Sequence, residues 1–135
     1  MNRAIEFHDS TISAVIDEGR SVVIKLDPAY IHESAGKPSI DRGLGFIQEV
    51  HLRISEPSLR PVLDALPCTI MDGSLIIGGT CHDNVIPLPM IYAGPTEFRC
   101  KTDVGGRLVI KGSGVVAVLK GERKYLEEYP GESAT

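Results

Sequence analysis

The chain has 135 residues, which is within the usual size of one domain. A chain of that length buries enough apolar surface to fold without a metal or a disulfide framework. Acidic residues outnumber basic ones by 18 to 14, for a formal charge of −4, and Lys and Arg do not cluster along the sequence. Binding to nucleic acid depends on clustered cations, so these totals argue against a nucleic-acid partner.

The N-terminus and the cysteines predict a cytoplasmic protein. Residues 1–6 carry charges where a secretion signal needs an apolar core, and no apolar run approaches the ~18 residues of a membrane-spanning helix. The three cysteines are odd in number and contain no C-x-x-C pair, which fits reduced thiols.

The first half of the chain predicts strands around one long loop. Residues 4–7 form a first short strand, and residues 12–16 and 22–26 alternate in polarity on either side of a turn, which is typical of a hairpin. Residues 27–46 lose the alternation and contain several Gly and Pro, so we expect a long loop there, which is our candidate recognition surface. Residues 47–54 alternate again, with Val50, Leu52 and Ile54 facing inward.

The middle of the chain predicts a weak helical turn and a second hairpin. Prolines exclude a central strand from residues 55–67, where residues 61–66 could form one short helical turn. The dipeptide Asp72-Gly73 lies between two apolar runs, residues 68–71 and 74–77, and favours a two-residue hairpin turn. Residues 85–89 contain two prolines and belong at a sheet edge.

The last third of the chain predicts short strands separated by glycines. Residues 97–101 place Phe98 and Cys100 inward, and a turn at residues 104–106 leads into residues 107–126, which we expect to fold back through tight turns. The apolar run from Val115 to Leu119 requires cover on both faces, so this strand should be central.

Short glycine-punctuated strands indicate the fold class. We predict a single all-β domain over residues 1–135, an antiparallel β-sandwich or flattened barrel of 8–10 short strands with at most one helical turn. Residues 130–135 should form a flexible tail.

Two polar clusters near the N-terminus are candidates for chemistry. His8-Asp9-Ser10 contains the residue types of a serine hydrolase, but neighbours on a strand point to opposite faces and no G-x-S-x-G turn is present. The structural interpretation is that Asp9 or Ser10 stabilises a turn. If His8 and His32 approach each other beside Asp9 and Glu33, they could serve a metal or general acid-base catalysis.

A third cluster is Cys81-His82-Asp83, in which Cys81 is the accessible thiol and Cys81 and His82 are possible metal ligands. Cys68 and Cys100 share faces with core residues and are expected to be buried. Residues 41–45 contain G-x-G but lack the third glycine and the helix of a dinucleotide site, and the sequence implies no cofactor.

The stretch Phe7-His8-Asp9-Ser10-Thr11-Ile12, followed by a hairpin into residues 22–26, resembles the opening of several families of small bacterial β-rich proteins. Some members of these families are thought to be immunity proteins of toxin systems. The resemblance covers about the first fifth of the chain. It implies a stoichiometric protein-binding role and assigns no catalytic residue.

The leading functional hypothesis is a non-enzymatic protein-binding module. Its partner would be another protein, such as a basic nuclease, or a second copy of the chain through an exposed sheet face. The binding candidates are Tyr30, His32, Glu33, Asp41 and Arg42, in and beside the long loop. The alternative is a small hydrolase or metal-dependent enzyme that uses the His and carboxylate cluster, and a small-molecule pocket inside a barrel is a third possibility.

Overall fold

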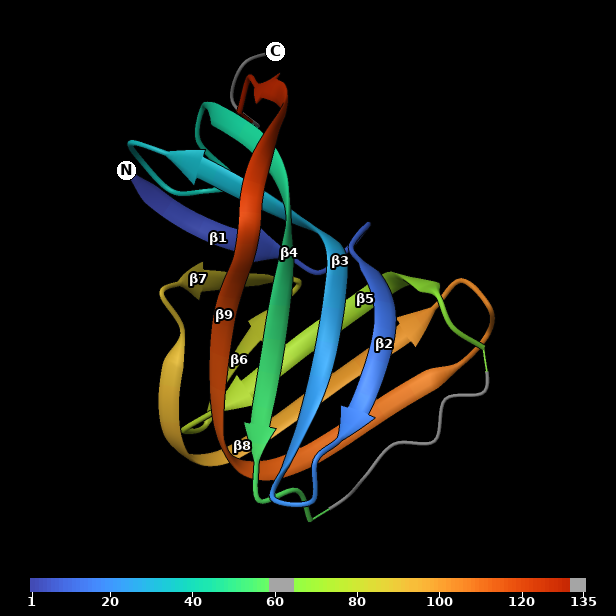
Figure 1. The fold of residues 1–135 in the computed structure, drawn as a ribbon. Helices are drawn as coiled ribbons and strands as arrows, with labels where there is room; N and C mark the ends of the chain where they lie inside the picture. Colours follow the sequence, from blue (N-terminus) through green and yellow to red (C-terminus); the bar gives the residue numbers. More distant parts are fainter. Residues whose placement is uncertain (59–64, 132–135) are drawn as a thin grey trace.

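The computed structural model describes residues 1–58 and 65–131, and these residues form antiparallel strands and turns without a helix (Figure 1). The nine strands are β1 (Asn2–Glu6), β2 (Thr11–Asp17), β3 (Ser21–Ser34), β4 (Gly43–Ser55), β5 (Cys68–Ile77), β6 (Thr80–Asp83), β7 (Val85–Leu88), β8 (Ile91–Thr102) and β9 (Arg107–Tyr129). No helix in the described ranges is long and apolar enough to cross a membrane.

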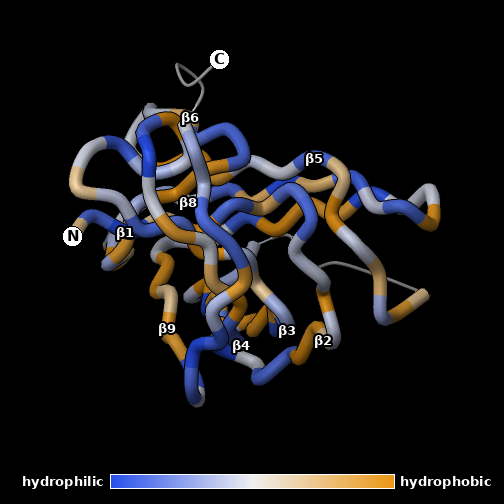
Figure 2. Tube along the Cα trace, turned by 90° about the horizontal axis from the view of Figure 1, so that it is seen from above, coloured by the Kyte–Doolittle hydropathy of each residue, from blue (hydrophilic) through white to orange (hydrophobic). Residues whose placement is uncertain are grey.

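The sheet closes on itself. Its strands follow the order β2-β5-β8-β9-β4-β3, and β3 pairs again with β2, so these strands form a ring. β1 and β7 extend the sheet beyond β3, and β6 pairs with β5. Seen from above, β5 and β8 lie on one side and β4, β3 and β2 on the other (Figure 2), and β9 connects the two sides because it pairs first with β8 and then with β4. The predicted all-β antiparallel class, as a flattened barrel or sandwich, is confirmed.

Two long strands each serve two sets of partners. β3 pairs with β2 through residues 22–26 and, after a bulge between Leu26 and Ala29, with β1 through residues 30–34. β9 pairs with β8 through residues 107–116 and with β4 from Gly114 to Tyr129. The ring and its extension therefore share one continuous backbone hydrogen-bond network.

Apolar side chains from every side of the ring fill its interior. Phe7, which follows β1, meets Phe98 of β8 edge to face, with ring centroids 5.3 Å apart. Val50, Leu52 and Ile54 of β4 are fully buried, as their alternation predicted. The predicted hairpin of residues 12–16 and 22–26, the inward Phe98 and Cys100, and the turn before Arg107 are also confirmed.

The predicted hairpin turn at Asp72-Gly73 is wrong, because both residues lie inside the continuous strand β5. The turn comes later, at Gly78 and Gly79, both of which have positive φ. A Cβ added at Gly73 would lie 2.9 Å from the Cβ of Phe7. The glycine is required for a close approach in the core and not for a turn.

The predicted series of strands over residues 107–126 is also wrong, because β9 is a single strand of 23 residues. A Cβ at Gly112 would lie 2.4 Å from the carbonyl oxygen of Ser55. This glycine lets β9 pass closely over the end of β4 as it changes partner from β8 to β4 (Figure 1). The predicted central position of the Val115 segment, between β8 and β4, is confirmed.

The long loop predicted over residues 27–46 is reduced to residues 35–42, because β3 runs to Ser34 and β4 begins at Gly43. The bulge after Leu26 interrupts the alternation without ending the strand. Gly45 belongs to β4, and a Cβ there would lie 2.3 Å from the hydroxyl oxygen of Tyr30. Residues 61–64 of the predicted helical turn and residues 132–135 of the tail lie outside the described residues, and β7 lies at the edge as predicted.

The replacement Gly73→Ala should lower the free energy of unfolding by about 1–3 kcal/mol, because the added methyl group overlaps Phe7. Ser74→Ala, one residue further on, alters an outward side chain and should change stability by about 0.5 kcal/mol or less. Urea unfolding of the two variants provides the comparison. Equal stabilities would contradict the close packing of Gly73 on Phe7.

Candidate functional site

The sequence candidates Tyr30 and His32 lie on the same face of β3, next to β1. His32 is 4% exposed, and its Nε2 is hydrogen-bonded to the Glu6 carboxylate at 2.7 Å. The hydroxyl of Tyr30 donates to Glu127 of β9, and burial raises the pKa of Tyr30. The ring of Tyr129 packs edge-on against His32, with centroids 5.0 Å apart. This network stabilises β9 against β3 across Gly45 of the intervening strand.

Glu33 faces the other side of β3 and forms an ion pair with Arg123 of β9. The guanidinium of Arg123 also lies over the ring of Phe46, 4.1 Å from its centroid. Such a contact adds a modest attraction between the two side chains. Glu33 is therefore a partner within the fold, as Tyr30 and His32 are.

His8 and Asp9 occupy the turn between β1 and β2, and in the described part of the chain neither forms a hydrogen bond or an ion pair with His32. His8 donates a hydrogen bond from Nδ1 to the carbonyl oxygen of Met71 at 2.8 Å, and this bond raises the pKa of His8. Asp9 has a φ of 72°. Ser10 Oγ donates to the Glu6 carbonyl at 2.6 Å and accepts from the Tyr30 amide at 3.0 Å. Ser10 stabilises the turn, as its structural interpretation predicted.

The remaining sequence candidates are also separated. Asp41 accepts a hydrogen bond from the Lys37 amide at 2.6 Å, and the Arg42 carbonyl accepts one from Ser34, so both residues shape the 35–42 turn. Cys81 is exposed on β6, with His82 beside it, and the described residues contain no group of His, Cys, Asp and Glu that could hold a metal. Cys68 and Cys100 are buried as predicted, and burial raises the pKa of Cys100 to about 12.

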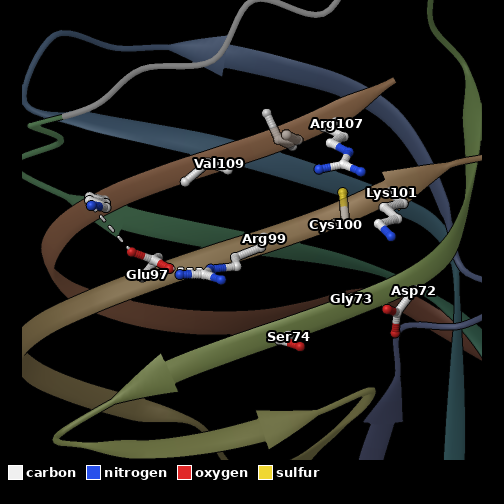
Figure 3. A pocket seen from close by; sticks show the side chains of 11 residues that line it. Asp72, Gly73, Ser74, Glu97, Arg99, Cys100, Lys101, Arg107 and Val109 are labelled. Atoms are coloured by element: carbon white, nitrogen blue, oxygen red, sulfur yellow. Dashed lines mark hydrogen bonds and ion pairs between the residues drawn. The ribbon is translucent and has the colours of Figure 1, made fainter. Parts of the chain in front are cut away.

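Another surface feature lies away from these residues, on the outer face of β5, β8 and β9 (Figure 3). It is a half-open hollow of about 460 Å³, which we call the cationic groove. Four basic side chains from two neighbouring strands line it. They are Arg99 and Lys101 of β8, and Arg107 and Lys111 of β9, with Asp72, Ser74, Glu97 and Val109 among the other lining residues.

The pairing register of β8 and β9 determines which charged residues of the groove lie opposite one another. Lys101 is directly opposite Arg107, and Glu97 is directly opposite Lys111. Glu97 accepts a hydrogen bond from Arg99 and lies 3.5 Å from the Lys111 ammonium, and the bond from Arg99 lowers the pKa of Glu97. One carboxylate thus serves two cations at this end of the groove.

The other end of the groove holds two cations, Lys101 and Arg107, beside the single carboxylate of Asp72. Asp72 is the cross-strand neighbour of Lys101, but its carboxylate accepts from the Asn84 side chain at 3.0 Å. Within the described part of the chain, Lys101 and Arg107 have no ion pair. Like charges directly opposite on neighbouring strands destabilise a sheet.

The groove differs in charge from the rest of the molecule. Its four cations and two carboxylates give a formal charge of +2, while the whole chain carries −4, so the other residues together carry −6. Basic residues that are dispersed along the sequence are therefore brought together by the pairing of β8 with β9. The sequence contains a pattern that could have predicted this cluster. Residues 99, 101 and 107 lie on either side of the predicted turn at residues 104–106, and alternate residues of a hairpin share one face.

Comparison of the chain with protein-family models, with curated proteins and with solved structures found no match.

The replacement His32→Ala should lower the free energy of unfolding by about 2 kcal/mol or more, because it leaves a cavity among the two tyrosines and removes the partner of Glu6. His8→Ala, in the exposed turn, should cost about 0.5 kcal/mol or less. Chemical unfolding of both variants at neutral pH measures the difference. An equal loss in the two variants would contradict the structural role of the His32 network.

Proposed function

We propose that this protein is a non-enzymatic binding protein that recognises an acidic segment of another protein through the cationic groove. The observation that carries the proposal is the opposition of Lys101 and Arg107, neither of which has an ion pair among the described residues, in a hollow whose lining residues carry a net positive charge. Two like charges held side by side destabilise the folded chain, and an anionic partner would relieve their repulsion.

The environment of the groove supports binding over catalysis. Its lining residues include one hydroxyl, on Ser74, and this hydroxyl donates to Asp83 at 2.9 Å. Among the described residues, no histidine lines the groove to act as a base, and the thiol of Cys100 is buried. An activated nucleophile needs an adjacent base or a lowered pKa. The histidines of the alternative enzyme hypothesis belong to the turn at His8 and to the His32 network.

The charge distribution supports a protein partner with an acidic segment. A compact positive region on an otherwise negative molecule orients an approaching anionic segment and disfavours other approaches. The resemblance of residues 7–12 and the following hairpin to small bacterial β-rich proteins, some of which are thought to be immunity proteins, also fits stoichiometric protein binding. The groove favours an acidic contact over the basic nuclease considered from the net charge. Three unpaired cysteines support action in the cytoplasm, where thiols stay reduced.

The double replacement Lys101→Gln with Arg107→Gln should weaken binding of an acidic peptide about tenfold or more, since both unpaired cations are lost. The probe is a fluorescein-labelled peptide with a short central run of glutamates flanked by glycine and serine, followed by fluorescence anisotropy at low ionic strength. The matched control is Lys120→Gln with Lys124→Gln, which removes two cations of β9 outside the groove. Equal losses in the two double variants would contradict a specific role for the groove.

The single replacement Lys101→Gln should leave stability unchanged or raise it by about 0.2–1 kcal/mol, because it removes the repulsion from Arg107. Thermal unfolding in the absence of peptide gives the measurement. A clear loss of stability would indicate that Lys101 serves the fold, and the functional interpretation of the groove would fail.

A further inference from the structure

A second hollow of about 390 Å³ adjoins the cationic groove on the same outer face. The two hollows share Glu97 and Lys111 as lining residues. Beyond that shared pair, the second hollow is lined among the described residues by small and uncharged positions such as Gly78, Gly79, Pro95 and Thr96. The outer face thus offers a continuous path with cations at one end and no charge at the other.

Glu97 lies at the junction of the two hollows. Arg99 and Lys111 hold its carboxylate from two sides, and the side chain is 16% exposed. The cross-strand neighbours of Glu97 are Ile76 on β5 and Lys111 on β9. A ligand that runs from the cationic groove into the second hollow therefore crosses a position where Arg99 and Lys111 are already paired with a carboxylate.

We propose that Glu97 makes this surface select a protein segment with a short acidic cluster beside uncharged residues, and reject a continuous polyanion such as a nucleic acid. The inference rests on the proposed function and names its ligand class. The acidic cluster lies against Lys101 and Arg107, while uncharged residues of the same segment cross Glu97 and occupy the second hollow. Because Glu97 is paired with Arg99 and Lys111, a continuous polyanion gains little attraction from these two cations and still loses the solvation of its own charges there.

The lining of the path supports the choice of a protein ligand. Neither hollow is lined by an aromatic side chain among the described residues. Proteins that bind single-stranded nucleic acid depend on aromatic side chains for base stacking as well as on cations. An extended peptide needs only charge complementarity, backbone contacts and space for its side chains.

The experiment compares three labelled probes by fluorescence anisotropy under the same salt conditions. They are the peptide with a central run of glutamates flanked by glycine and serine, an all-glutamate peptide of equal length, and a single-stranded oligothymidylate. The wild-type protein should bind the first probe about tenfold more tightly than the other two. Glu97→Gln should reduce this preference to about twofold or less by strengthening binding of the continuous polyanions.

Two control variants separate charge from shape. Glu97→Asp keeps the negative charge and should retain the preference of the wild-type protein. Glu128→Gln neutralises an exposed carboxylate of β9 outside both hollows and should leave the preference unchanged. Circular dichroism establishes that each variant keeps its strands.

The outcomes separate the two proposals. If the wild-type protein binds none of the probes, the proposed function fails. If it binds them but prefers the all-glutamate peptide or the oligothymidylate, or if Glu97→Gln leaves the preference intact, the selective role of Glu97 is wrong and the binding function of the groove stands.

Discussion

Closure of the sheet is the constraint on which the rest of the structure depends. A closed ring leaves the backbone groups of its strands paired on both sides, but its strands must bend and cross at short distances. Gly112 lies within such a crossing, where its backbone passes the Ser55 carbonyl oxygen, and Gly73 allows Phe7 to enter the core. The same bend in β9 frees its second half to pair with β4 and extends the sheet toward β1 and β7.

This architecture explains why the polar residues near the N-terminus are structural. The extension of the sheet has no closed ring to stabilise it, so side chains connect β1, β3 and β9 across its face. The pairs His32 with Glu6 and Tyr30 with Glu127 join residues far apart in the chain. The groove, in contrast, lies on the wall of the ring, where β8 is paired on both sides, with β5 and with β9, and where Lys101 and Arg107 have no ion pair among the described residues.

The sequence predicted the fold class and several strands because alternation reports which face of a strand is buried, as in residues 47–54. The sequence-based prediction failed where a glycine is needed for a close tertiary contact. Gly73 and Gly112 lie in sequences typical of turns, but each is needed because the chain passes close to another residue, Phe7 and Ser55 respectively. It failed again at the groove, because the net charge of the chain hides a local excess of cations. The pairing of Lys101 with Arg107 follows from a hairpin register that composition does not contain.

The central claim is that the outer face of β5, β8 and β9 is the recognition surface. The most direct test is to record the backbone amide resonances of the protein while an acidic peptide is added. The account predicts that shifts concentrate in residues 72–74, 97–101 and 107–111. Shifts confined to residues 30–42, around His32 and the turn that follows it, would contradict the account and return the binding site to the region favoured by the sequence alone.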